Sequence, residues 1–398
     1  MDRQLTQLHV QNFRSLRDVT IPLGPVNVLA GPNGSGKTNV LDVFRFLAEM
    51  YRSNPADRME LGDLMKSVFG KHGGYWNVAS WGDETRPKIQ VGLEGIWTRY
   101  SSHNTPDRYK LEFNPVTNLV VYRSSLEFKR IGGPGRPITL NFQSSWFESG
   151  KDVGCPLDTV TEEAGEALRS RDEPAAVDGQ AEAEEFTDEL ASLRDVPADA
   201  DLANDAHAAL LARRADGSHW QPLVEDARRL LPQLENIEVE NSPHSHEDRV
   251  VLHERGLRRP TPLADASAGT IRLLGLLALL YDPEPPALTS IDGIERGIHP
   301  QALELLVERI REASERTQFL ITTHSHALVD WLRPEELIVC ERRDDGSSAI
   351  PALSTNRIKK IQKEWEGLPL GRLWFSGALG GDLNRDTARG PRVAAQPR

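Results

Sequence analysis

Residues 31–38 read Gly31-Pro32-Asn33-Gly34-Ser35-Gly36-Lys37-Thr38, which matches the pattern G-x-x-x-x-G-K-[ST]. A short apolar run, Val26 to Ala30, precedes this stretch, and a helix-like pattern, Asn39 to Leu47, follows it. In a strand–loop–helix setting the glycines let the loop curl, so that backbone N–H groups point at phosphates and the helix N-terminus adds positive potential. We therefore predict a nucleotide site in which Lys37 reaches the β- and γ-phosphates and Thr38 binds Mg²⁺.

The overall composition is that of a folded protein with a sizeable core. Apolar residues make up 38% of the 398 residues, and a chain of this length forms one large domain or several ordinary ones. The longest apolar run, Leu273 to Tyr281, is far shorter than the about 20 residues that span a bilayer. The start lacks the layout of a signal peptide, and the two cysteines, Cys155 and Cys340, suggest neither a disulfide framework nor a zinc cluster. We therefore expect a cytoplasmic protein without a membrane partner.

The charge of the chain is acidic and unevenly distributed. The formal net charge is −12, which argues against bulk affinity for nucleic acid. Acidic residues and alanine dominate 158–216, and we expect 157–218 to be a solvated, partly flexible insertion, with a helical structure as the alternative. Basic residues cluster at Arg255, Arg258 and Arg259 and again at 357–363. These clusters are either solvated surface, which we favour, or contacts to DNA.

The remaining periodicity predicts further elements. Residues 5–30 alternate apolar and polar side chains with turn signals at 12–14 and 23–25, as strands joined by tight turns do. Residues 86–146 again favour strands, and an antiparallel meander is the natural arrangement. A helix-like run at 220–231 precedes two further strand-like stretches, 236–240 and 249–253.

Three more motifs follow in the second half of the chain. Ser267 and Gly269 stand at the start of a strongly apolar helix, where they form either an anion site or an ordinary helix cap. A short apolar strand then ends in Asp292, the usual place for the Asp that organises Mg²⁺ beside a phosphate loop. The last motif is a β-rich run, 318–323, that ends at His324. Each motif is weak alone, and their order gives them weight.

In this order the motifs resemble those of the ATP-binding-cassette (ABC) type of ATPase, and more narrowly the branch that includes RecF, SMC heads and the OLD-type ATPases. The matching segments are Leu-His-Val-Gln-Asn-Phe-Arg-Ser-Leu at 8–16, the loop at 31–39, Ser-x-Gly-Thr at 267–270, Asp-x-x-Glu-x-Gly-Ile-His-Pro at 292–300 and Thr-Thr-His-Ser at 322–325. The C-terminal segment 370–381 resembles a tail seen on small bacterial ATPases of this branch, many of them in phage-defence operons.

The resemblance implies an α/β fold, namely an ABC-type P-loop ATPase head with a mixed or parallel core sheet, an antiparallel β subdomain and a helical subdomain. We expect an N-terminal lobe with the phosphate loop and the meander at 1–150, and the acidic insertion at 151–235. A C-terminal lobe with the signature, the Asp strand and the switch His would occupy 236–345, and a tail would occupy 346–398.

The resemblance also implies a head-to-tail homodimer with two ATP molecules and Mg²⁺ at its interface. Each ATP would lie on the phosphate loop of one subunit under the signature of the other, so that ATP joins the subunits and hydrolysis releases them. The cofactor-binding residues would be Asn33, Gly34, Ser35, Gly36, Lys37, Thr38, Asn39, Ser267 and Gly269. The Mg²⁺ ligands would be Thr38 and Asp292, and the catalytic residues Lys37, Asp292, Glu295 and His324, the last of which would sense the γ-phosphate.

The sequence departs from the family at residue 293. The family usually has a glutamate directly after the strand-end Asp, where it polarises the attacking water, but this chain has Gly293, which cannot accept a proton. Glu295 lies two residues on and would point the same way in an extended chain. It either substitutes for the missing glutamate or has a structural role. The expected function is a slowly hydrolysing dimeric switch in DNA repair or anti-phage defence, and the alternative is a nucleotide-dependent clamp or sensor with negligible turnover.

A nuclease domain, which OLD-type proteins carry after the ATPase, would not fit into the residues beyond His324. Glu341, Asp344 and Asp345 gather there, but the second-strand pair of acids that a nuclease needs is missing. The Asp-Gly turn in this stretch predicts a β-hairpin instead. We therefore expect any nuclease activity to come from a separate effector protein, and DNA is a further candidate partner.

Overall fold

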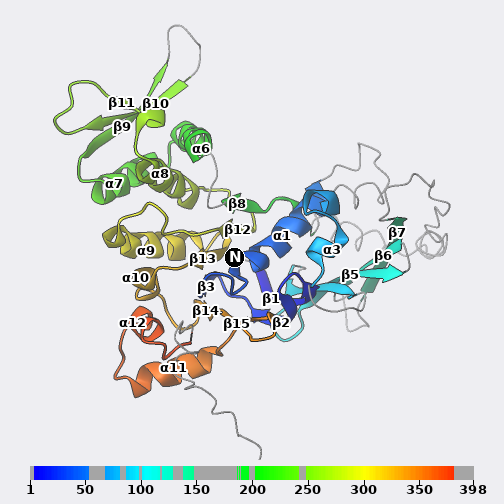
Figure 1. The fold of residues 1–398 in the computed structure, drawn as a ribbon. Coiled ribbons are helices and arrows are strands. Elements are labelled where there is room, and N and C mark those ends of the chain that lie inside the picture. The colour runs from blue at the N-terminus through cyan, green and yellow to red at the C-terminus, as the bar shows by residue number, and fades with distance from the viewer. Residues whose placement is uncertain are drawn as a thin grey trace, which may run out of the picture.

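The computed structural model describes residues 4–52, 68–80, 87–97, 101–116, 119–128, 138–147, 186, 188, 190–196, 202–241 and 248–380. These residues form an α/β structure with a parallel core sheet, a large antiparallel sheet on one side and a helical lobe on the other (Figure 1). No helix in these ranges is long and apolar enough to cross a membrane.

The core sheet has five parallel strands in the order β14 (Leu337–Val339), β3 (Val26–Ala30), β13 (Gln318–Thr323), β12 (Leu288–Ile291) and β8 (Arg194–Val196). Every residue of β3, β12, β13 and β14 is buried. A parallel sheet covered on both faces needs apolar runs of this kind instead of alternation. The strand expected before the phosphate loop is therefore an inner strand of the sheet.

The antiparallel sheet has the order β2 (Leu16–Pro22), β1 (Gln4–Phe13), β4 (Ile89–Ile96), β5 (Asp107–Val116), β6 (Leu119–Phe128) and β7 (Ile138–Phe147). The meander expected at 86–146 is confirmed, because β4 to β7 pair in sequence order. The turn expected at 12–14 is confirmed too, with Asn12 at φ 56° and Arg14 at φ 47°.

Helix α1 (Lys37–Arg52) packs between the two sheets. Its apolar residues, among them Phe44 and Phe46, share one core cluster with β1, β2, β4 and the buried face of the core sheet. The short helix α3 (Tyr75–Val78) joins the same cluster through Tyr75, whose hydroxyl donates to the carbonyl of Pro87 at 2.6 Å.

The helical lobe forms a second core cluster on the other face of the core sheet. It contains α6 (Leu202–Asp216), α7 (Trp220–Leu230), α8 (Ala268–Leu280), α9 (Leu303–Ala313) and α10 (His326–Val329), with the short helices η2 (Leu263–Asp265) and η3 (Pro300–Ala302). A small antiparallel sheet of β9 (Leu234–Asn241), β10 (Asp248–Glu254) and β11 (Thr261–Pro262) lies beside α6 and α7 (Figure 1). The last described elements are the hairpin of β15 (Glu341–Arg342) and β16 (Ser348–Ala349), then α11 (Thr355–Glu364) and α12 (Leu370–Phe375).

The acidic stretch at 157–218 falls partly outside the described residues. Where it is described, it contains the strand β8 and the helix α6, whose Ala206 packs against Gly275 of α8. The stretch is also not purely an insertion, since β8 pairs with β12 as the edge strand of the core sheet. The limits expected for the four domains stay a prediction.

Asp226 of α7 is a buried charged residue of the helical lobe. Its side chain is 2% exposed and pairs with Arg309 of α9, and the hydroxyl of Tyr281 donates to it at 2.6 Å. Burial alone would raise the pKa of Asp226, but the hydrogen bonds from Arg309 and Tyr281 outweigh burial and lower it. A lowered carboxyl pKa stabilises the fold above the ordinary value of 3.8, and that stabilisation is lost as the pH falls below it.

We predict that Asp226→Ala lowers the free energy of unfolding by about 3 kcal/mol, because it removes the buried partner of Arg309 and leaves this half-buried guanidinium only its contact with the exposed Glu312. Glu225→Ala, the exposed neighbour on the same helix, is the matched control and should leave the urea midpoint nearly unchanged. The difference between the two variants should shrink below about pH 4, where Asp226 protonates in the unfolded chain. Equal midpoints at pH 7 would contradict this account of Asp226.

Candidate nucleotide-binding site

Three of the predicted motifs meet at the carboxyl edge of the core sheet. The phosphate loop follows β3, His324 follows β13 and Asp292 follows β12. The parallel register pairs Ala30 with Thr323 and Ile291 with Ile321, so the three strands end side by side. Asp292 and Glu295 are close enough to Lys37 for their charges to raise its pKa. Ligands of open parallel sheets bind at this edge.

The phosphate loop is shaped by glycines and by a buried lysine. Gly34 and Gly36 have φ of 78° and 100°, a conformation that favours glycine. The Nζ of Lys37 donates to the carbonyls of Gly31 and Pro32, both at 2.9 Å. Burial lowers the pKa of Lys37, and the nearby Cys340, Asp292 and Glu295 partly offset this effect. Lys37 is 5% exposed, and among the described residues its ammonium group donates only to these two uncharged carbonyl groups.

These features fit a bound phosphate chain. The Oγ of Ser35 is buried and has no hydrogen-bond partner among the described residues, which is the condition of a group that awaits a ligand. Asn33, Gly34 and Thr38 are exposed at the mouth of the loop, and Asn39 is half-buried at the start of α1. The N-terminus of α1 supplies free N–H groups and the positive end of the helix dipole.

Asp292 is oriented by the side chain of Thr322. Its Oδ1 accepts a hydrogen bond from the hydroxyl of Thr322, which also accepts from the backbone N–H of Gly293 at 2.8 Å. Together with Thr38 it offers the two protein oxygens that Mg²⁺ typically takes beside substrate phosphates. The described residues contain no cluster of three or more His, Cys, Asp or Glu ligands, so a cation here would depend on the phosphates as well.

Gly293 and Glu295 explain the departure from the family pattern. Gly293 is buried with φ 59°, and a Cβ at this position would lie 2.8 Å from the Nε of Arg296. Both oxygens of Glu295 are engaged: one accepts from the backbone N–H of His324 and the other from the hydroxyl of Thr323, each at 2.8 Å. This pairing favours the structural role of Glu295, which braces the end of β13.

His324 is exposed beside this brace. Partial burial lowers the pKa of its imidazole, and the charge of Lys37 lowers it further. The ring is therefore neutral at pH 7 and can donate one hydrogen bond and accept another.

Ser267 and Gly269 lie apart from the loop at the start of α8. Ser267 is exposed and caps the helix by accepting from the N–H of Thr270 at 3.1 Å, so the cap alternative is realised within one chain. Gly269 abuts Gly297, because a Cβ on Gly269 would overlap the Gly297 carbonyl. Among the described residues, neither Ser267 nor Gly269 forms a hydrogen bond to the phosphate loop.

Two sets of contacts near the candidate site were not predicted from the sequence. Arg272 of α8 is buried, and its Nη2 donates to the carbonyls of Asp292 at 3.0 Å and Gly293 at 2.9 Å. A single arginine in an apolar helix carries no motif. Its burial only becomes visible once α8 is packed against the end of β12.

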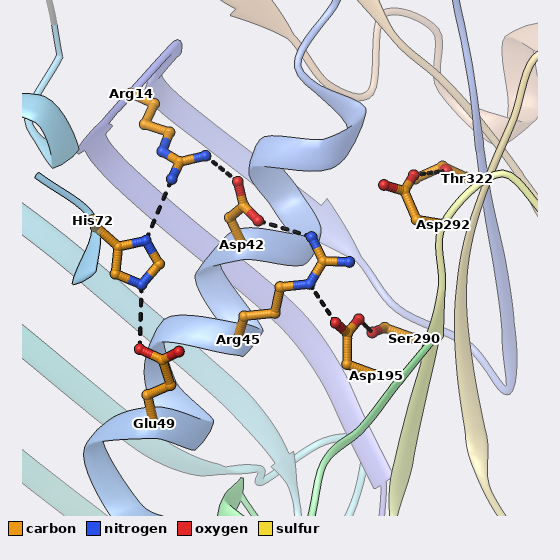
Figure 2. A network of polar contacts seen from close by, with 9 residues as sticks. All are labelled: Arg14, Asp42, Arg45, Glu49, His72, Asp195, Ser290, Asp292 and Thr322. Atoms are coloured by element: carbon orange, nitrogen blue, oxygen red, sulfur yellow. Dashed lines mark hydrogen bonds and ion pairs between the residues drawn. The ribbon is translucent and has the colours of Figure 1, made fainter. Parts of the chain in front are cut away.

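The second is an ionic chain that connects α1 with the core sheet (Figure 2). Arg45 donates to Asp42 at 2.9 Å and to Asp195 at 2.7 Å, and Asp195 accepts from Ser290 of β12. Arg14 from the β1–β2 turn pairs with Asp42 at the other end, and its guanidinium is also beside His72. Arg14, Asp42 and Arg45 lie in segments with a sequence signal, but Arg45 and its partner Asp195 are 150 residues apart, so the sequence pattern did not predict their contact.

Comparison with known proteins agrees with this geometry. Residues 26–330 match the family model described as "AAA domain, putative AbiEii toxin, Type IV TA system". The chain is 54% identical over 37 residues to the OLD nuclease of Thermus scotoductus, covering 9% of this chain and 7% of that protein. It is 40% identical over 73 residues to the DNA replication and repair protein RecF of Anaeromyxobacter dehalogenans, covering 15% of this chain and 20% of that protein. The chain thus matches a fifth or less of these relatives.

Solved structures resemble the whole fold. The Smc head domain of Pyrococcus furiosus, solved with an extended coiled coil and the C-terminal domain of ScpA, superposes with a TM-score of 0.50 at 15% identity, over 92% of this chain and all of that chain. At this identity the likeness concerns the fold alone. The expected fold class is confirmed, and so is the expected resemblance. The chain belongs to the family described as AAA domain, putative AbiEii toxin, Type IV TA system, and its motifs and fold resemble those of ABC-type P-loop ATPases of the RecF/SMC/OLD class.

Proposed function

We propose that this chain is a nucleotide-gated dimeric switch that binds ATP with Mg²⁺ and hydrolyses it slowly. The observation that carries the proposal is the convergence of Lys37, Asp292 and His324 at one edge of the core sheet, while Ser267 presents a helix N-terminus to solvent. This convergence supports a composite site, of which one part would come from the phosphate loop of one copy and the other from the exposed start of α8 of a second copy.

The residues of the loop bind and orient the nucleotide. Lys37 exchanges its two carbonyl acceptors for phosphate oxygens, Ser35 gains the partner that its buried hydroxyl lacks, and Thr38 and Asp292 hold Mg²⁺. ATP supplies the γ-phosphate, which distinguishes it from ADP. His324, neutral and exposed beside the loop, donates a hydrogen bond to that group, so the ATP-bound surface differs from the ADP-bound one.

A second copy completes the site through α8. The exposed N-terminus of this 13-residue helix offers free N–H groups and a positive dipole end, and Ser267 adds a hydroxyl. These N–H groups and this hydroxyl can bind an anion. The γ-phosphate of ATP on a partner subunit is such an anion, and it is present only before hydrolysis. The homodimer is therefore favoured by ATP and released by hydrolysis.

Slow turnover follows from residues 293 and 295. Gly293 offers no base, and the carboxylate of Glu295 already accepts two hydrogen bonds from the end of β13. The same observation favours a second candidate function, a nucleotide-dependent clamp or sensor with negligible turnover. The two differ in steady-state phosphate release and not in ATP-dependent assembly.

The biological setting belongs to the proposal as well. Two relatives are a nuclease and a DNA replication and repair protein, and the matched family includes putative toxins of toxin–antitoxin systems. These names support a role in anti-phage defence or DNA repair, in which the switch gates a separate effector such as a nuclease. DNA remains a candidate ligand of the exposed Arg258 and Arg259, which have no ion-pair partner among the described residues.

We expect Lys37→Ala to abolish ATP binding, because the ammonium group neutralises the β- and γ-phosphates and the loop has no second cation of its own. Isothermal titration of a non-hydrolysable ATP analogue with Mg²⁺ is the measurement. Affinity equal to that of the wild type would refute the nucleotide site.

ATP-dependent dimerisation is tested by substituting two helix N-cap serines, one inside and one outside the signature. Ser267 and Ser354 are both exposed N-cap residues, each accepting from an N–H three residues on, but only Ser267 belongs to the signature. Both Ser→Arg variants lose a cap worth about 1 kcal/mol. Light scattering should show that Ser267→Arg stays monomeric with the ATP analogue, whereas Ser354→Arg dimerises like the wild type. Dimerisation of both variants would leave Ser267 as a cap only.

Glu295 is tested by comparing Gln with Ala. A glutamine keeps both contacts, because its amide can accept from the N–H of His324 and pair with the hydroxyl of Thr323, but it cannot act as a base. We predict that Glu295→Gln retains most of the wild-type phosphate release at saturating ATP and Mg²⁺, whereas Glu295→Ala loses most of it. An equal loss in both variants would identify Glu295 as the base instead. Glu304→Gln, an exposed carboxylate of α9, serves as the control.

A further inference from the structure

The C-terminal hairpin β15–β16 forms a wall of the phosphate loop, although it lies beyond residue 330, where the family match ends. The backbone N–H of Ser348 donates to the carbonyl of Ser15 at 2.8 Å, and the hydroxyls of the two serines are 2.7 Å apart. Asn39 of α1 donates to the Ser15 hydroxyl at 2.7 Å. The hairpin, the β1–β2 turn and the first turn of α1 are thus joined by one polar cluster.

The loop approaches this wall so closely that only glycine fits. A Cβ on Gly36 would overlap the hydroxyl of Ser348 and lie 2.9 Å from that of Ser15, and a Cβ on Gly31 would overlap the carbonyl of Cys340. Gly36 is therefore required by the neighbouring hairpin, and Gly31 by Cys340, which leads into the hairpin, as well as by the curl of the loop. Side chains of β15 consequently stand beside the nucleotide site.

Arg342 is the side chain of the hairpin that reaches the loop. It is exposed, and its Nη1 donates to the carbonyl of Gly34 at 3.2 Å, the one polar contact of its side chain among the described residues. The other two arginines at this wall are engaged elsewhere: Arg343 bonds to Ser347 and Ser348 within the hairpin, and Arg17 pairs with Asp345 at 3.1 Å. The guanidinium of Arg342 thus lies at the loop and has no ion-pair partner among the described residues.

The strand order indicates which part of a bound nucleotide the guanidinium of Arg342 can contact. Strand β14, which leads into Arg342, pairs with β3 on the side opposite to β13 and β12. His324 and Asp292, the groups assigned to the γ-phosphate and Mg²⁺, follow β13 and β12. Arg342 therefore approaches the loop from the side away from the γ-phosphate.

We propose that Arg342 is a nucleotide-binding residue of this ATPase that contacts the phosphate groups shared by ATP and ADP. The inference rests on the proposed function, since it takes the phosphate loop as a nucleotide site. A guanidinium exchanges a neutral carbonyl for phosphate oxygens with a gain in charge-assisted hydrogen bonding. The hairpin thereby contributes affinity for both nucleotides, and His324 contributes the preference for ATP.

The experiment measures the dissociation constants of Mg·ADP and of a Mg-bound non-hydrolysable ATP analogue by isothermal titration. Arg342→Ala should weaken both about tenfold, the loss expected for one charged hydrogen bond. Arg342→Lys keeps the charge and should recover part of the affinity, whereas Arg342→Gln can still donate to the Gly34 carbonyl but should not recover it. Arg343→Ala is the matched control for the integrity of the hairpin and should change either constant less than about threefold.

The outcomes separate this inference from the proposed function. If the wild type binds neither nucleotide, or if Lys37→Ala binds as well as the wild type, the nucleotide site itself is refuted and Arg342 with it. If the wild type binds and Arg342→Ala binds equally well, only the role of Arg342 is refuted. A loss confined to the ATP analogue would place Arg342 at the γ-phosphate instead, and full recovery by Arg342→Gln would reduce it to a brace of the loop. Melting temperatures of all variants check that each is folded.

Discussion

Parallel pairing of β3 with β13 is the constraint on which the rest of the structure depends. It sets Ala30 opposite Thr323, so that a loop near the start of the chain and a histidine almost 300 residues later leave the sheet side by side. Lys37 is buried at this junction, and its charge lowers the pKa of His324 while Asp292 and Glu295 support the charge of Lys37. A shift of this register by two residues would separate these groups by about 6 to 7 Å. Backbone pairing thus decides which positions lie side by side at this edge of the sheet.

The helical lobe is connected to this edge through backbone groups. Arg272 donates to the carbonyls of Asp292 and Gly293, and Gly269 touches Gly297 without room for a side chain. A movement of α8 along its axis must therefore either break buried charged hydrogen bonds, each worth about 1.5–3 kcal/mol, or carry the end of β12 with it. The Arg45 bridge from α1 to Asp195 connects the phosphate-loop helix to the same part of the sheet.

Much of this arrangement was predictable from the sequence, because the informative signals are local. The glycine pattern at 31–38, the apolar run before Asp292 and the alternation at 86–146 each predicted the right element. Local signals fail where a residue is explained only by a partner far along the chain. Strand β8 is three residues long in an acidic, alanine-rich stretch, and nothing in it indicates a place in the core sheet. Arg272, Arg45 and the hairpin that contacts Gly36 likewise acquire their roles only through packing. The residues that would contact a nucleotide remain a prediction from motif and geometry.

The glycine at 293 shows why a catalytic group cannot be read from one position alone. The backbone there has φ 59°, and its N–H is fixed by the same Thr322 hydroxyl that holds Asp292. A glutamate would incur about 1–2 kcal/mol of backbone strain and displace Arg296, and its carboxylate would start from a left-handed conformation. A general base contributes about 10²–10⁴-fold only when it is positioned within hydrogen-bond reach of the water. Inserting the glutamate side chain would therefore not by itself place a base at the water, because the turn after β12 has a glycine conformation and the carboxylate of Glu295 already accepts two hydrogen bonds from the end of β13.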